Sequence, residues 1–265
     1  MIHPTAIIHP DAKLHPTVRV GPYAVIDGGV ELGAGCVVGP HVYLTGLTSI
    51  GANNRFHAGC VIGDAPQDLK YADEPTRLRI GDGNVFREHA TVHRSNKVAE
   101  DTVIGAHGLF MANCHVGHNS LIGDHVILAN GALLGEHVTV GDRAFISGNS
   151  VVHQFVRVGT LAMLQGGSAL SQDLPPFCVA SGLNCVRGLN AVGLRRAGYS
   201  SAERLELKRL YRLIFREGRA FRAALAEAQA KFTSAPAKTF IEFAAATKRG
   251  LCADTGKLKD LEAAD

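Results

Sequence analysis

The sequence predicts a mainly β protein, in which a parallel β-helix over residues 1–189 is followed by a C-terminal α-helical domain over residues 190–265. Two observations predict the β-helix: an aliphatic residue recurs every six positions, and glycine is abundant, with 30 among 265 residues, while tryptophan is absent. An α-helix needs an apolar period of 3.6 and an ordinary strand a period of two, so a period of six fits neither. The α-helical domain is predicted because glycine thins out after about Leu189.

The six-residue repeat starts at Ile2, returns at Ile80, and runs again from Ile104. Each repeat opens with Ile, Leu, Val or Phe, and its fifth position is mostly small, as at Ala24 and Cys60. Small residues are expected where side chains face inward at a tight corner. We therefore expect the cysteines at fifth positions to be core residues rather than metal ligands.

Two insertions, residues 64–79 and 94–103, interrupt the repeat without shifting it. The steps from Ile62 to Ile80 and from Ile80 to Ile104 are both multiples of six. Each insertion should therefore be a loop that leaves a coil and rejoins it. Repeat proteins usually carry such insertions on their binding face.

The C-terminal segment predicts three helices. A capping box of Ser200 and Glu203 begins the first, which should stop at Gly218. A second is expected over 219–232, and a third from Pro236 to Gly250. We expect these helices to cover the end of the solenoid, where unpaired strand edges would otherwise be exposed.

Composition excludes several classes of partner. The net charge of +3, with lysine and arginine dispersed through residues 1–190, predicts no nucleic-acid binding. No apolar run approaches the roughly 18 residues of a spanning helix, which predicts no membrane insertion. Six cysteines without a CxxC spacing, and an N-terminus unlike a signal peptide, predict a cytoplasmic protein.

Most of the 13 histidines, His93 among them, are expected to be surface or corner residues without chemistry. One group differs, because residues 18 apart share a column on successive coils of three repeats. His118, Glu136 and Gln154 form such a column, and His115, His137 and His153 lie beside it. The sequence therefore predicts a polar site along one wall, with His118 facing out of the solenoid.

Several motifs resemble one family. They are QDLKYADEPT at 67–76, NCHVGHNS at 113–120, VHQF at 152–155, QDLPPF at 172–177 and GLRRAGYS at 193–200. Over nearly the whole chain the sequence resembles the cytosolic UDP-N-acetylglucosamine (UDP-GlcNAc) O-acyltransferases that start lipid A biosynthesis, whose solenoid is a left-handed β-helix. The resemblance implies a homotrimer that transfers an (R)-3-hydroxyacyl chain from acyl carrier protein to the 3-hydroxyl of UDP-GlcNAc. It implies no cofactor beyond the phosphopantetheine carried by that donor.

The resemblance also implies roles for individual residues. His118 matches the general base, and the backbone N–H of Glu136 matches the oxyanion donor, where the family has glycine. The matches for substrate binding are Gln67, Asp68 and Lys70 for the sugar and phosphates, His115, His137, His153 and Gln154 for groove contacts, and Asn190 and Arg196 for the uridine and diphosphate. Gly166 matches the residue that limits acyl-chain length, and Gln165 beside it is the rival. The loop carrying Asp68 and Lys70 is expected to lie across from the neighbouring subunit's base.

Three positions depart from the family pattern. Asn119 stands where the family often has an aspartate next to the base, and an amide orients an imidazole without supplying a full charge. Val192 replaces a glutamate and Ala197 replaces an arginine near the nucleotide. These departures leave a 3-amino analogue of UDP-GlcNAc open as the acceptor.

Other functions remain open on the sequence alone. A related sugar-nucleotide N-acyltransferase of the same pathway shares the solenoid and a histidine, but normally carries an N-terminal uridine-binding domain for which repeats starting at residue 2 leave no room. A zinc enzyme like the β-helical carbonic anhydrases would place two ligands five residues apart, whereas His115 and His118 are three apart. A purely structural solenoid would lack the charged loop QDLKYADEPT.

Overall fold

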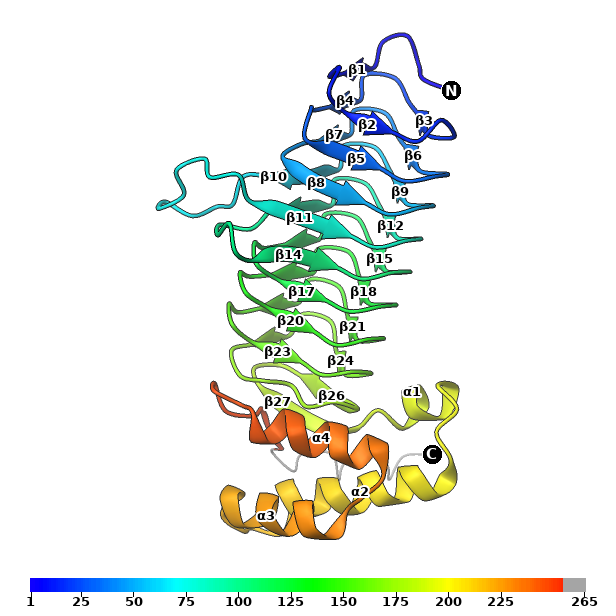
Figure 1. The fold of residues 1–265 in the computed structure, drawn as a ribbon. Helices are drawn as coiled ribbons and strands as arrows, with labels where there is room; N and C mark the ends of the chain where they lie inside the picture. Colours follow the sequence, from blue (N-terminus) through cyan, green and yellow to red (C-terminus); the bar gives the residue numbers. More distant parts are fainter. Residues whose placement is uncertain (255–265) are drawn as a thin grey trace.

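The computed structural model describes residues 1–254, which form a three-walled solenoid with helices at one end (Figure 1). The nine-stranded wall consists of β1 (Ile7–Ile8), β4 (Val25–Ile26), β7 (Tyr43–Leu44), β10 (Val61–Asp64), β13 (Thr91–His93), β16 (His115–Val116), β19 (Leu133–Leu134), β22 (Val151–Val152) and β25 (Ala169–Leu170). The eight-stranded wall consists of β2 (Lys13–Leu14), β5 (Val30–Leu32), β8 (Leu47–Ile50), β11 (Arg77–Ile80), β14 (Asp101–Ile104), β17 (Leu121–Ile122), β20 (Thr139–Val140) and β23 (Arg157–Val158). The eleven-stranded wall consists of β3 (Arg19–Val20), β6 (Val37–Val38), β9 (Arg55–Phe56), β12 (Val85–Phe86), β15 (Leu109–Phe110), β18 (Ile127–Leu128), β21 (Phe145–Ile146), β24 (Met163–Leu164), β26 (Cys178–Ser181), β27 (Cys185–Leu189) and β28 (Ala253–Asp254).

Strands along each solenoid wall pair in parallel with the equivalent strand of the next coil, except that β27 pairs antiparallel with β26 at the end of the eleven-stranded wall. His115 pairs with Leu133, and Leu133 pairs with Val151, so one coil takes 18 residues where no insertion intervenes. The two insertions lengthen their coils, but Ile62 still pairs with Val92 and Ile80 with Ile104. The register shifts locally between Ile62 and Asp64, where the first insertion begins. The expected left-handed parallel β-helix is confirmed.

Both insertions leave the solenoid at the same edge. The first follows β10 and the second follows β13, and each returns to the eight-stranded wall, at β11 and β14. The first loop projects far from the solenoid in Figure 1. The loops are shorter than predicted, because residues 77–79 already belong to β11 and residues 101–103 to β14. They lie on successive coils directly before the corner that contains His118.

The interior is narrow and mostly apolar. Phe56, Phe86 and Phe110 stack on successive coils, with ring centroids 5.0 and 4.7 Å apart. The fifth-position cysteines are buried and unpaired as expected, and burial raises the pKa of the Cys60 thiol to about 11. Because every coil repeats the same small and aliphatic pattern, the core continues without a break between walls.

The helices follow the solenoid as α1 (Ala191–Arg196), α2 (Ser201–Phe215), α3 (Phe221–Lys231) and α4 (Ala235–Ala245). The capping box of Ser200 and Glu203 at the start of α2 is confirmed. Sequence reasoning missed α1, a single short helix capped by Asn190. None of the helices in residues 1–254 is long and apolar enough to cross a bilayer.

Helix α4 ends at Ala245, so the predicted end at Gly250 is wrong. The chain turns back because its next residues bind the last coils. Thr247 Oγ1 donates to the buried Asp173 carboxylate at 2.9 Å, and Arg249 Nε donates to the Ser171 carbonyl. The segment then adds β28 alongside β27, so backbone pairing covers the open end of the solenoid.

Candidate functional site

His118 lies in the corner between β16 and β17 and is only 5% exposed. It lies outside the apolar core, as expected, but residues of the second insertion bind the adjacent Asn119. Its Nδ1 atom is 2.8 Å from Asn119 Oδ1. The imidazole is therefore held in a polar, largely water-excluded setting at the solenoid edge.

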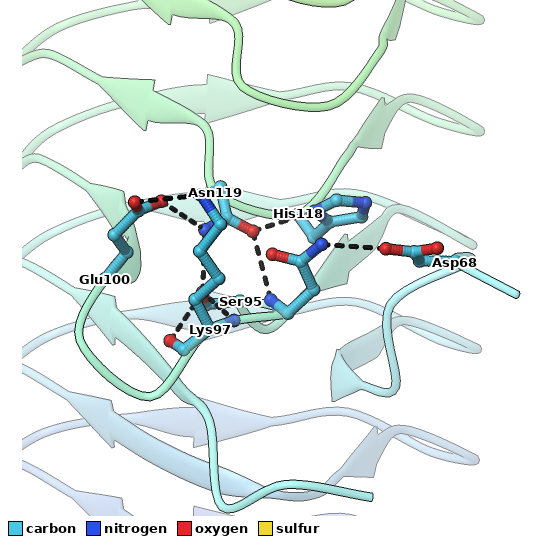
Figure 2. Close-up of polar contacts among 7 residues, drawn as sticks. Asp68, Ser95, Lys97, Glu100, His118 and Asn119 are labelled. Carbon is cyan, nitrogen blue, oxygen red and sulfur yellow. Dashed lines mark hydrogen bonds and ion pairs between the residues drawn. The ribbon is translucent and has the colours of Figure 1, made fainter. Parts of the chain in front are cut away.

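Asn119 is the centre of a hydrogen-bond network around this imidazole (Figure 2). Its Oδ1 accepts from the Asn96 backbone N–H at 3.0 Å. Its Nδ2 donates to Ser95 Oγ at 2.8 Å and to Glu100 Oε2 at 2.9 Å. Its own N–H donates to Thr102 Oγ1 at 2.8 Å. Residues of the second insertion and of β14 thus fix both the backbone and the amide of Asn119.

Asp68 reaches the same network from the first insertion. Its Oδ2 accepts from Asn96 Nδ2 at 2.8 Å, and the Lys70 N–H donates to its Oδ1 at 3.0 Å. The Lys70 N–H first, and then the Asn96 amide, lower the pKa of the Asp68 carboxyl. Within one chain, Asp68 binds Asn96 and lies near the chain's own His118 (Figure 2). That its loop lies across from a neighbouring subunit's base stays a prediction.

The rest of the first insertion extends outward. Arg94 holds the loop where it leaves the solenoid, because its Nε donates to Tyr71 Oη and its Nη1 donates to the Gly63 carbonyl. Gln67 and Lys70 are exposed beside Asp68, and Leu69 between them is fully exposed. A fully exposed leucine at a braced loop tip is an apolar contact group without a partner in a single chain.

Two further histidines lie beside His118 on the nine-stranded wall. His115 Nδ1 is 2.8 Å from Thr91 Oγ1, and burial lowers the pKa of His115. His93 packs edge-on against His115, with ring centroids 4.8 Å apart. Burial first, and then the neighbouring His115, lower the pKa of His93 to about 4.

The placement of His93 corrects the expectation that it is a surface residue. It is buried because it ends β13 just where the second insertion begins, so the insertion covers it. Asn96 and Glu100 were also missed. The repeat pattern carries no signal for insertion residues, and the only usable clue was that the insertion starts directly after His93.

His137 and Glu136 occupy the next coil of the same edge. The rings of His118 and His137 meet edge-on at 5.5 Å, and His137 stacks on Phe155 at 4.7 Å. The His137 N–H donates to the His118 carbonyl, which sets the Glu136–His137 peptide directly beside His118. Within residues 1–254 the Glu136 N–H donates no hydrogen bond, so it is available to a substrate oxyanion.

His153 and Gln154 lie one coil further along this edge, and both are exposed. Arg249 Nη2, from the returning C-terminal segment, lies 3.4 Å from His153 Nδ1. These two residues therefore share the expected column with His118 but do not contact it. Coils repeat at about 4.8 Å, so they lie roughly two coil spacings away.

The remaining predicted residues lie on the other two edges of the solenoid. Asn190 donates from Nδ2 to the Leu161 carbonyl at 2.9 Å and caps α1, which ends at the exposed Arg196. That edge joins the eight-stranded and eleven-stranded walls. Gln165 and Gly166 are exposed where the eleven-stranded wall meets the nine-stranded wall. One chain therefore does not bring these residues to its own His118.

The titratable groups do not gather as metal ligands. Among the described residues, no three His, Cys, Asp or Glu side chains have an arrangement that holds a metal ion. The Nδ1 atoms of His115 and His118 instead face a hydroxyl and an amide oxygen. The cluster is suited to proton transfer between neutral imidazoles and a bound hydroxyl.

The left-handed solenoid and this histidine edge define a hexapeptide-repeat acyltransferase. A family model for the bacterial transferase hexapeptide (six repeats) matches residues 11–46, and one for UDP N-acetylglucosamine O-acyltransferase, domain 2, matches residues 173–252. The chain is 43% identical to the acyl-acyl carrier protein–UDP-N-acetylglucosamine O-acyltransferase of Saccharophagus degradans, over 94% of this chain and 98% of that protein. The chain belongs to this UDP-N-acetylglucosamine O-acyltransferase family.

Other relatives agree in sequence and in structure. The enzyme of the same name from Thermodesulfovibrio yellowstonii is 41% identical over 95% of this chain and 98% of its own length. The UDP-N-acetylglucosamine O-acyltransferase structure from Moraxella catarrhalis superposes with a TM-score of 0.91 at 38% identity, covering 95% of this chain and 99% of that one. The Francisella novicida UDP-N-acetylglucosamine acyltransferase superposes with a TM-score of 0.93 at 32% identity, covering 96% and 95%.

The lowered pKa of His93 predicts a loss of stability in acid. The pKa rises from about 4 in the folded protein to 6.5 in the unfolded chain, so the unfolded chain binds more protons in between. The stability that neutral His93 contributes is fully present above pH 6.5 and is lost as the pH falls toward 4. In His93→Gln, the fall in unfolding free energy from pH 7 to pH 5, measured by urea titration, should be about 2 kcal/mol smaller than in the wild type. Equal falls in both proteins would contradict the buried, neutral state of His93.

Proposed function

We propose that this chain transfers an (R)-3-hydroxyacyl group from acyl carrier protein to the 3-hydroxyl of UDP-GlcNAc, the first step of lipid A biosynthesis, with His118 as general base. The observation that carries the proposal is the buried His118, whose Nδ1 is engaged by Asn119 while Nε2 has no partner among the described residues. The relatives with this name extend over nearly the whole chain. The phosphopantetheine of the donor protein is the only prosthetic group that the reaction requires.

The chemistry follows from the weakness of a sugar hydroxyl as a nucleophile. His118 Nε2 takes the hydroxyl proton while the oxygen attacks the thioester carbonyl. The tetrahedral intermediate then collapses, the C–S bond breaks, and the imidazolium returns the proton to the leaving thiolate. The Glu136 N–H is the donor we assign to the oxyanion, because it donates no hydrogen bond within residues 1–254 and its nitrogen lies next to Gly117, which precedes His118.

The surrounding residues suit an acceptor with a sugar and a diphosphate. We assign sugar and phosphate contacts to Gln67, Asp68 and Lys70, since an ammonium and a carboxylate beside the base bind phosphate and hydroxyl groups respectively. His115 and His137 orient the reacting groups, and His153 and Gln154 continue the groove along the same edge. Asn190 and Arg196 complete nucleotide binding from a second subunit.

We propose a homotrimer, and the positions of these residues support an assembly of more than one chain. Asn190 and Arg196 are on a different edge from His118, so a site that uses all three needs two chains. The fully exposed Leu69 and the outward-facing Leu133 and Val151, each 44% exposed, are apolar groups that an adjacent subunit would cover. We place the enzyme in the cytoplasm, because its cysteines are unpaired.

The nine-stranded wall offers a path for the acyl chain. His118 lies at one edge of this wall, and Gly166 lies at its other edge, further toward the helices. Leu133 and Val151 face outward between them and pair on adjacent strands. An acyl chain that crosses this wall therefore ends near Gly166, which leaves room for a long chain because it lacks a side chain.

His118→Ala should lower turnover by at least about a hundredfold, the usual contribution of a positioned acid-base group. The assay mixes acyl carrier protein thioesters with UDP-GlcNAc and identifies products by mass, with circular dichroism and gel filtration as folding checks. His9→Ala, an exposed histidine on the first coil, is the matched control and should keep wild-type turnover. Wild-type turnover in His118→Ala would require another base, with His137 the next candidate.

Mixed trimers should test the shared site. His118→Ala and Arg196→Ala are each expected to be impaired as homotrimers, the second by about tenfold in kcat/KM through a lost phosphate contact. Random co-assembly leaves one intact site in each mixed trimer, so co-expression should restore about a quarter of wild-type activity. Activity equal to the mean of the two homotrimers would argue that each site belongs to one chain.

Gly166→Met should shift the preferred donor to shorter chains and leave the KM for UDP-GlcNAc unchanged. A Cβ at Gly166 meets the Gly148 carbonyl oxygen only at 3.4 Å, so the backbone accepts a side chain. The wild type should prefer about 12 to 14 carbons, because each buried methylene contributes up to about 0.8 kcal/mol. A wild-type preference for 10 carbons that Gln165→Gly lengthens would identify Gln165 as the residue that limits chain length.

A further inference from the structure

The orientation of the Asn119 amide is fixed by two partners whose hydrogen-bond roles are unambiguous. The Asn96 backbone N–H can only donate, so the atom 3.0 Å from it is the amide oxygen. The Glu100 carboxylate can only accept, so the atom 2.9 Å from it is the amide nitrogen. Ser95 Oγ accepts from that nitrogen at 2.8 Å, but a hydroxyl would serve either orientation.

This orientation determines which nitrogen of His118 carries the proton. Asn119 Oδ1 is an acceptor and lies 2.8 Å from His118 Nδ1, so Nδ1 must be the N–H of the neutral ring. Nε2 then carries the lone pair. If the amide were turned over, its NH₂ group would face Nδ1 and stabilise the opposite tautomer, in which Nε2 is protonated and does not accept a proton.

Glu100 is suited to control this choice. It lies in the second insertion, across Asn119 from His118 (Figure 2), and Lys97 Nζ donates to its Oε1 at 3.0 Å. Lys97 first, and the Asn119 amide after it, lower the pKa of the Glu100 carboxyl, which is therefore ionised at neutral pH. A full negative charge is thus two hydrogen bonds away from the imidazole.

Asp68 reaches the same network but does not control the orientation of the Asn119 amide. It contacts Asn96 through the side-chain amide, whereas Asn96 contacts Asn119 through its backbone N–H. A backbone N–H donates whichever group binds the side chain. Removal of Asp68 would therefore leave the donor at Asn119 Oδ1 unchanged.

We propose that Glu100 is a positioning residue that acts through Asn119. Its carboxylate holds the amide in the orientation that leaves His118 Nε2 unprotonated, and its charge stabilises the imidazolium formed when Nε2 takes the hydroxyl proton. Glu100 and Asn119 together thus supply what an aspartate beside the base would supply alone. This inference rests on the proposed role of His118 as the base.

The test exchanges the positions of the charge and the amide. In E100Q the charge is lost, together with one of the two contacts that fix the amide orientation, so kcat should fall by about tenfold with KM for UDP-GlcNAc changed less than about twofold. N119D alone sets two carboxylates in hydrogen-bond contact and should also be impaired. In the double variant E100Q/N119D, the new carboxylate accepts from His118 and from the new amide, so kcat should exceed that of both single variants.

K97Q is the matched control, because it breaks the ion pair with Glu100 from the other side and leaves the carboxylate in place. Its kcat should stay within about twofold of the wild type. Glu100 and Lys97 are both exposed, so neither substitution buries an unpaired charge, and thermal melting checks that each variant folds.

Three results would overturn the inference: wild-type kcat in E100Q, an equal loss in K97Q, or a double variant whose kcat does not exceed that of both single variants. A double variant that recovers kcat supports it, because a purely structural loop contact would not be restored by moving the charge. His118→Ala is measured alongside. If it is inactive while E100Q is normal, only the role of Glu100 fails; if it is fully active, the proposed base itself fails.

Discussion

The backbone ladder between coils is the constraint on which the rest of the molecule depends. Each coil donates and accepts hydrogen bonds along three walls, so each must return to the same wall in the same register. Added residues are tolerated only as loops that leave one strand and rejoin the next, as between β10 and β11 and between β13 and β14. Parallel strands of two residues gain little stability alone, so the repeated register supplies the cooperativity of the core.

The same constraint builds the site. Because both insertions leave from one edge on consecutive coils, they lie over the corner that the next coil presents there. Asn119, next to His118 in that corner, binds Asn96 and Ser95 of the second insertion. Asp68 of the first insertion binds the Asn96 side chain. A corner that would otherwise be exposed to solvent is in this way converted into a covered polar site with fixed hydrogen-bond directions.

The electrostatics of this edge follow from burial and from where the carboxylates lie. Burial lowers the pKa values of His93, His115 and His137, which keeps these rings neutral at neutral pH. The two carboxylates that reach the network, Asp68 and Glu100, have lowered pKa values and stay ionised. Burial keeps several rings from being protonated at once. The nearby carboxylates stabilise the positive charge when one ring takes up a proton.

The sequence by itself determined the wall architecture, the buried cysteines, the capping box at Ser200, and the column of residues 18 apart. These follow from local periodicity, and each coil repeats the same physical requirement. It did not determine the end of α4, the burial of His93, or the contacts of Asn96 and Glu100. Those depend on how non-repeating segments fold back onto the solenoid, and a six-residue pattern contains no information about a segment that breaks it. The tertiary structure alone decided which groups surround His118, because its partner Asn119 is held by Ser95, Asn96 and Glu100, which come from a loop whose path is set by contacts distant in sequence.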